Sequence, residues 1–255
     1  MGDLDEAVFA AFVAEDCFFS DFSWGVGGVF NRRRKTSSPF SWSLSFGSSI
    51  VMPNPWELPL PLTADTDDSR VFEWLGRAIN EWERIEFSLS TLYSFFVGDT
   101  TLGSIKGYGE GRIFRERADI LKRAAERWFV QNSHQEFEGE FNRLMTAVTG
   151  FSDRRNEFAH GIVMEVSRFT FWRARLPLAS PSSLWFLIIP PVQVARKQDD
   201  KGMPAYGYSS YELLILTERL GDMLVELHMF NGRLWPKDWP PAATRKALGI
   251  PSHGK

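Results

Sequence analysis

Two side chains suited to phosphate binding and to proton transfer stand close together in this chain, at Arg155 and His160, with four residues between them. The arginine guanidinium is planar and permanently charged, and its paired N–H groups match two oxygens of a phosphate group. Histidine is the side chain whose ordinary pKa allows it both to accept and to donate a proton near neutral pH. The pair therefore predicts a site that cleaves a phosphodiester bond without a metal ion.

The neighbours of this pair indicate how its side chains work. Asn156 supplies an amide that is able to orient His160 or to bind a phosphate oxygen, and Arg154 satisfies a five-residue spacing, so it can assist or replace Arg155. Five positions along an ideal helix turn a side chain by about 140°, so the arginine and the histidine of one chain do not lie side by side. Two chains related by a twofold axis would bring two motifs into one cleft. We therefore expect a homodimer formed through the motif helices.

Apolar residues at intervals of three and four predict three long helices around the motif. The first spans about residues 70–98 and ends at Gly98, and a capping side chain precedes it. The segment 98–111 is rich in glycine and reads as a loop. The second helix starts near Phe114 and the third near Gln135, so the motif falls late in the third helix.

The period of the sequence changes after the motif. Short runs of aromatic and β-branched residues predict a small β-hairpin at about 166–190, with its first strand around 168–173. Ser209 and Glu212 then form a capping box that starts a last long helix, which is expected to close at Gly232.

The chain divides into three parts. Residues 1–69 are an N-terminal arm of unknown function, expected to be partly irregular or disordered, and their basic run at 32–35 reads as a solvated cluster. Residues 70–232 form the helical domain with its hairpin. Residues 233–255 are a proline-rich C-terminal tail.

Composition limits the class of protein. The chain has 255 residues, of which 44% are hydrophobic, so it is long enough to bury a core. A net charge of −3 argues against a protein that coats nucleic acid non-specifically. The lone Cys17 forms no intramolecular disulfide, and four scattered histidines lack the spacing of zinc ligands, so neither a metal nor a cofactor is expected. Prolines interrupt the long uncharged stretch at 36–56, so no membrane contact and a cytoplasmic location are expected.

The string from Arg155 to Gly161, late in a long helix, resembles the signature of the HEPN superfamily (higher eukaryotes and prokaryotes nucleotide-binding). That signature is an arginine, four to six residues and a histidine, often with a polar residue after the arginine. The resemblance covers residues 70–232. It implies a mainly α, HEPN-like antiparallel helical bundle, here with a small β-hairpin insertion after the motif helix. The hairpin and the N-terminal arm are departures from the minimal bundle.

The resemblance also implies a function. Arg155 and His160 would be catalytic and Asn156, with Arg154, would support them in a metal-independent endoribonuclease of the kind found in toxin–antitoxin and phage-defence systems. Its partners would be an RNA substrate, a second copy of the chain and an antitoxin or modifying enzyme. The alternative is a non-catalytic HEPN module that binds a nucleotide, an RNA or a protein. A structural alternative also stands, in which Gly161 forms a left-handed helix cap and Arg155 pairs with Asp153 or with a glutamate of another helix.

Overall fold

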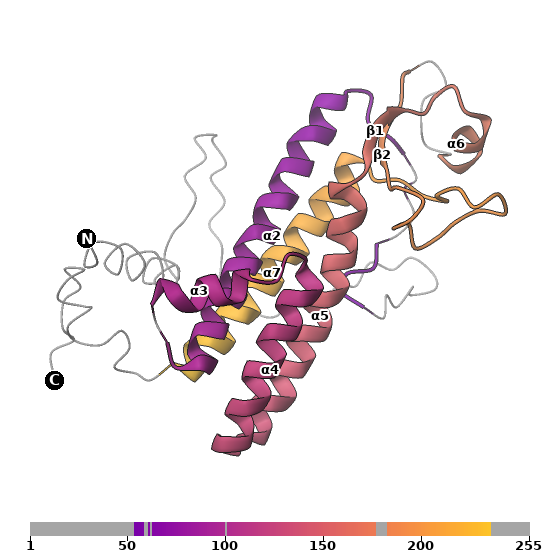
Figure 1. Ribbon diagram of the computed structural model, residues 1–255. Coiled ribbons are helices and arrows are strands. Elements are labelled where there is room, and N and C mark those ends of the chain that lie inside the picture. The colour runs from indigo at the N-terminus through magenta and orange to yellow at the C-terminus, as the bar shows by residue number, and fades with distance from the viewer. Residues whose placement is uncertain (1–53, 59–60, 62, 100, 177–182, 236–255) are drawn as a thin grey trace, which may run out of the picture.

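The computed structural model describes residues 54–58, 61, 63–99, 101–176 and 183–235, and this part of the chain is mainly helical with one small sheet (Figure 1). The elements, in chain order, are α2 (Asp68–Val97), α3 (Leu102–Gly109), α4 (Phe114–Asn132), α5 (Gln135–Ala159), β1 (Ile162–Glu165), α6 (Thr170–Arg175), β2 (Phe186–Ile189) and α7 (Ser210–Leu234). Cys17, the basic run at 32–35, most of the N-terminal arm and nearly all of the tail lie outside the described residues.

The first predicted helix is confirmed as α2. The Asp67 side chain accepts a hydrogen bond from the backbone N–H of Ser69, and Gly98 ends the helix in the left-handed conformation, at φ 68°. Such a cap favours glycine because a Cβ is strained there. One stripe of α2 is buried from Val71 to Phe96, so this helix forms a central wall of the core.

Helix α5 alone runs opposite to the other three long helices. Helices α2 and α4 share a direction, since Trp82 in the middle of α2 packs on Phe114 at the start of α4, and Phe96 near the end of α2 packs on Phe129 near the end of α4. Helix α7 also runs in the same direction as α2. A tight turn through Ser133, at φ 50°, reverses the chain between α4 and α5. The expected antiparallel arrangement therefore holds for α5 against its neighbours, whereas α2, α4 and α7 are parallel (Figure 1).

The glycine-rich segment 98–111 was expected to be a loop, but it contains the helix α3. Thr101 caps this helix, and Ser104 forms a buried hydroxyl contact of 2.7 Å with Ser94 of α2. Tyr108 donates a hydrogen bond of 2.9 Å to Glu86, also on α2. These tertiary contacts outweigh the low helix propensity of glycine.

The hairpin lies partly elsewhere than predicted. Strand β1 is antiparallel to β2, with Ile162 opposite Ile189, and thus begins directly after the motif. The aromatic run expected as the first strand is largely helix α6, in which the buried Trp172 packs with Leu176 and Leu187 in a small separate core. Sheet formation was anticipated correctly, but its first strand was placed too late in the chain.

Helix α7 begins as predicted and continues two residues past Gly232. Ser209 accepts from the helix start and Glu212 reaches back to the backbone of Ser209, which completes the capping box. Asp65, from the segment before α2, also accepts hydrogen bonds from the backbone N–H and the hydroxyl of Ser210. The start of α7 is thus fixed to the start of α2.

The segment 54–58 is fastened to the helical domain at two places. The Trp56 indole lies over Gly150 of α5, where an added Cβ would be 2.2 Å from the indole Cδ2. Arg219 of α7 donates to the carbonyl oxygens of Pro55 and Glu57. Residue 57 is therefore held close to both α5 and α7.

Candidate functional site

Helix α5 presents the motif at its C-terminal end. Phe151 and Phe158, seven positions apart, are both buried and anchor this part of the helix in the core. The helix ends at Ala159, and His160 occupies the position after its last turn, with its backbone N–H donating to the carbonyl of Asn156 at 3.3 Å. The motif therefore sits where α5 leaves the bundle and the sheet begins (Figure 1).

His160 is exposed to solvent. Within the described part of the chain its imidazole has no hydrogen-bonding partner, so both ring nitrogens are open to a ligand. An imidazole in this position is able to exchange a proton with a bound molecule.

Arg155 is half-buried and faces α2. Its Nη2 lies 3.6 Å from Oε1 of Glu83, and its Nη1 donates to Oδ1 of Asn156 at 3.3 Å. The Nε is buried and has no acceptor among the described residues. The ion pair is long and Glu83 is largely exposed, so it neutralises the guanidinium only weakly.

Arg154 occupies a different environment from Arg155. Its side chain is 1% exposed, and its Nη1 lies 2.6 Å from both carboxylate oxygens of Glu157, whose side chain is 0% exposed. This arginine is enclosed in the protein and does not reach the surface on which His160 lies. It is positioned to support the helix rather than to contact a substrate.

Glu157 is the centre of a buried polar network. Besides Arg154, its carboxylate accepts hydrogen bonds from the hydroxyl of Tyr208 and from Nε of Arg196, the latter at 3.1 Å. Burial raises the pKa of Glu157 to about 7, while hydrogen bonds from Tyr208, Tyr206 and Arg196 oppose the rise. The network ties the end of α5 to the loop between β2 and α7.

Gly161 does not adopt the left-handed cap that the structural alternative expected. Among the described glycines, only Gly98 and Gly202 have a positive φ. A Cβ on Gly161 would instead lie 2.3 Å from Cγ2 of Ile188. The glycine therefore allows α5 to pass close to β2, which places His160 beside the sheet.

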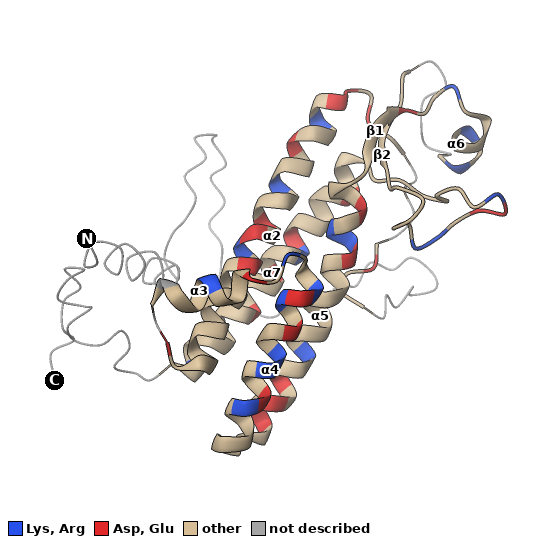
Figure 2. Cartoon of the chain, viewed as in Figure 1, with Lys and Arg blue, Asp and Glu red and all other residues tan. Residues whose placement is uncertain are grey.

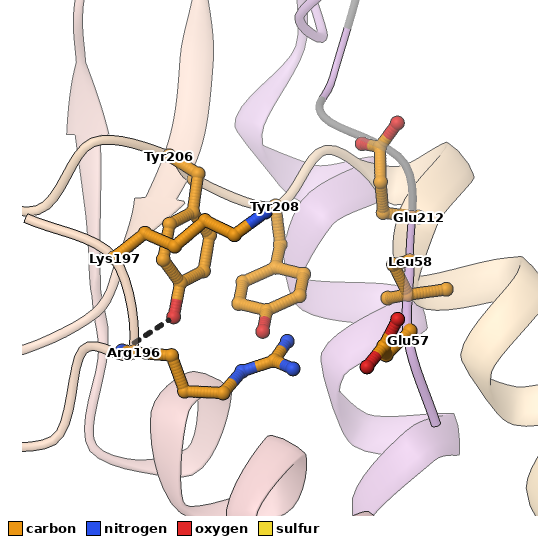
Figure 3. Close-up of a pocket in the computed structure, with 8 residues that line it drawn as sticks. Glu57, Leu58, Arg196, Lys197, Tyr206, Tyr208 and Glu212 are labelled. Carbon is orange, nitrogen blue, oxygen red and sulfur yellow. Dashed lines mark hydrogen bonds between the residues drawn. The ribbon is translucent and has the colours of Figure 1, made fainter. Parts of the chain in front are cut away.

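A cavity adjoins this network. It has a volume of about 130 Å³, and its lining includes Glu57, Arg196, Lys197, Tyr206, Tyr208 and Glu212 (Figure 3). Two of these residues, Arg196 and Tyr208, also hold Glu157 of the motif helix. The cavity and the motif thus share a wall.

Of the four residues singled out from the sequence, the structure brings Arg155 and Asn156 into contact and places His160 one turn beyond them, while Arg154 is separate. The sequence reasoning missed Glu157, Arg196 and the two tyrosines. Glu157 itself carried a signal, because it is a carboxylate one residue before the buried Phe158, where an unpaired charge is costly.

The surface charges near the motif are mixed. Acidic and basic residues alternate along α4, as is typical of a solvated helix face (Figure 2). In the described part of the chain no group of three or more His, Cys, Asp or Glu side chains is arranged to hold a metal ion. None of the helices described has the length and apolarity needed to cross a membrane.

Comparisons with protein-family models, with curated proteins and with solved structures give no match.

Proposed function

We propose that this chain is a metal-independent endoribonuclease of the HEPN type. The observation that supports the proposal most directly is the exposed imidazole of His160 at the end of α5, with no hydrogen bond to any described residue. Arg155 lies just over one turn earlier on the same helix, partly exposed and weakly paired. A proton-transfer group and a phosphate-binding group are therefore both accessible at the end of one rigid helix.

In the proposed reaction His160 takes the proton from a ribose 2′-hydroxyl, and the oxygen attacks the adjacent phosphorus. Arg155 stabilises the charge that builds on the non-bridging phosphate oxygens. The bond between phosphorus and the 5′-oxygen breaks, that oxygen takes a proton from water and leaves as a hydroxyl, and His160 then returns its proton to the solvent. The products are a 2′,3′-cyclic phosphate and a 5′-hydroxyl.

A second copy of the chain completes the proposed site. Because Arg155 and His160 diverge around α5 by about 140°, each phosphate would meet the arginine of one protomer and the histidine of its partner. A twofold axis next to the end of α5 would form two such sites. The toxin or phage-defence role suggested by the motif would follow from RNA cleavage by this dimer.

A second candidate is a non-catalytic module that binds RNA, a nucleotide or a protein. The Arg155–Glu83 ion pair favours it, since a guanidinium that already faces a carboxylate stabilises an incoming phosphate less. In that case the motif helix would contribute to binding without proton transfer by His160.

Cleavage of end-labelled single-stranded RNA in the presence of a chelator tests the proposal. The wild-type chain is expected to cut, and His160→Ala is expected to lower the rate by about 100-fold or more, the usual contribution of a general base. The matched control is His134→Ala, because His134 stacks on Trp128 at the opposite end of α5. Analysis of the product ends should show a 2′,3′-cyclic phosphate.

Equal cutting by the wild-type chain and by His160→Ala would refute the mechanism. RNA binding by the wild-type chain without cutting, unchanged in His160→Ala, would favour the binding module. Both variants should keep the wild-type melting temperature, because neither histidine is buried.

A further inference from the structure

The cavity beside Glu157 is lined by two cationic side chains, Arg196 and Lys197, and by two carboxylates, Glu57 and Glu212, and positive charges exceed negative ones only on its inner wall, the side that holds Glu157. Two guanidinium groups, those of Arg154 and Arg196, share the single carboxylate of Glu157 at 2.6 and 3.1 Å. Lys197, next in the chain, adds a further positive charge to the lining. One guanidinium charge is therefore left without a counter-ion in the inner wall, before Lys197 is counted.

The donors at this wall are also unused. The Nε of Arg196 donates a hydrogen bond to Glu157. None of the described residues accepts a hydrogen bond from its two terminal nitrogens. The guanidinium is directed past Tyr208 toward the Glu57 side of the cavity (Figure 3). The ammonium of Lys197 likewise has no partner in the part of the chain that is described. An anionic oxygen in the cavity would satisfy these donors.

The two carboxylates of the lining differ in availability. Glu212 is occupied by the capping box with Ser209, and its carboxylate points away from Arg196 (Figure 3). Glu57 lies on the opposite side of the cavity from Tyr206 (Figure 3), and among the described residues it accepts only from the side-chain amide of Asn54, at 3.0 Å. An ionised carboxylate has acceptors and no donor. Glu57 would thus repel a bare oxyanion and attract one that carries an O–H group.

The geometry points to a binding site for a protonated phosphate group, with Arg196 and Lys197 donating to its charged oxygens and Glu57 accepting from its P–OH. Inorganic phosphate keeps such a proton in part near neutral pH, and phosphate monoesters, whose second pKa is about 6, keep it at slightly acidic pH, whereas sulfate and phosphodiesters have none. The volume fits this class, since a cavity of about 150 Å³ holds a molecule the size of benzene and this one measures about 130 Å³. The site does not depend on the proposed nuclease activity.

Titration calorimetry of the full chain with inorganic phosphate, sulfate, AMP and dimethyl phosphate tests the assignment. Phosphate is expected to bind about tenfold or more tightly than sulfate or dimethyl phosphate, the effect of one charge-assisted hydrogen bond. Binding of AMP at least as tight as that of phosphate would identify a monoester as the occupant. Binding of inorganic phosphate alone would identify the free ion.

Three variants connect the binding to these residues. Glu57→Gln should raise the affinity for sulfate and bring the two anions within about threefold, since an amide also donates. Lys197→Met should weaken phosphate binding by about tenfold, and Lys201→Met, an exposed lysine on the same loop, should leave it unchanged. The assignment is overturned if the wild-type chain gives no phosphate signal at millimolar concentration, if sulfate binds equally well, or if Lys197→Met and Lys201→Met behave alike.

Discussion

The guanidinium of Arg154 and the carboxylate of Glu157 face each other one helical turn apart inside the protein, with Nη1 of Arg154 2.6 Å from both carboxylate oxygens. A buried ion pair is not by itself a large source of stability, because both charges must leave water. What the pair provides is an acceptor to which the loop before α7 is attached, through Arg196 and Tyr208. The end of the motif helix is thereby fixed in place.

Removal of the Glu157 side chain should destabilise the protein far more than its conversion to an amide. Glu157→Ala leaves Arg154 and Tyr208 buried without an acceptor and is expected to cost about 3–5 kcal/mol. Glu157→Gln keeps one carbonyl oxygen and should cost less than half as much. Urea unfolding measures both, with the exposed Glu218→Ala on α7 as the control. Equal losses for the two Glu157 variants would contradict the hydrogen-bonding role.

Stability should also depend on pH through the same carboxyl group. Its pKa rises from 4.5 to about 7 in the folded state because burial disfavours the charged form, so the folded protein binds the proton more tightly than the unfolded chain. The contribution is complete below pH 4.5 and is lost as the pH rises through 7, so the free energy of unfolding should fall across this range. Unfolding curves across this range test it. Glu157→Gln should flatten the profile, and an unchanged slope in that variant would assign the effect to another group.

Substitution by methionine should mainly lower the stability of the protein at Arg154 and mainly lower RNA cleavage at Arg155. Arg154→Met removes the enclosed partner of Glu157 and is expected to cost about 3 kcal/mol of stability. Arg155→Met removes the long pair with Glu83 and a hydrogen bond of 3.3 Å to Asn156, both at the half-exposed surface, so its cost should stay within about 1 kcal/mol. RNA cleavage should be lost in Arg155→Met although it remains folded. If Arg155→Met unfolds the chain, this residue has a structural role instead.

Mixing two inactive variants tests the composite site. In a dimer with each site built from Arg155 of one protomer and His160 of its partner, a mixed pair of Arg155→Ala and His160→Ala chains keeps one intact site. Random exchange makes half of the dimers mixed, so about a quarter of the wild-type activity should return. Each variant alone, carried through the same exchange, is the control. No recovery after confirmed exchange would place both residues of a site in one chain.

Removal of the carboxylate that caps α7 should loosen the contact between α7 and the start of α2. Asp65 is buried and accepts from the backbone N–H of Ser210 at 2.6 Å, so Asp65→Ala is expected to cost about 1–3 kcal/mol. Asp65→Asn keeps an acceptor and should lose less. Thermal unfolding compares the two with Asp222→Ala, an exposed aspartate in the middle of α7.

Local signals account for the features that were predicted from the sequence. The limits of α2 and the capping box of α7 were visible because a helix cap and its apolar stripe lie within a few neighbouring residues. Helix α3 was missed because its stability comes from contacts with α2, such as that of Ser104 with Ser94, and not from its own glycine-rich sequence. Tertiary packing therefore determines that this segment is helical.

The candidate site shows the same division. The motif located Arg155 and His160, and their exposure is compatible with the chemistry expected of them. Although Glu157 carried a local signal, the hydrogen bond that it accepts from Tyr208 was not predictable, because Tyr208 lies 51 positions further along the chain. Nor does spacing alone distinguish Arg154 from Arg155, which differ only in the side of α5 that the rest of the fold covers.

The close packing of Trp56 on Gly150 helps to position one side of the proposed phosphate pocket. Even one methyl group at residue 150 would collide with the Trp56 indole. The position of the segment that carries Glu57 therefore depends on the absence of a side chain in the middle of the motif helix. Gly150→Ala would therefore displace Trp56 and, with it, Glu57, without changing any polar group of the pocket. Residues 54–58 therefore keep their place beside α5 only while residue 150 has no side chain.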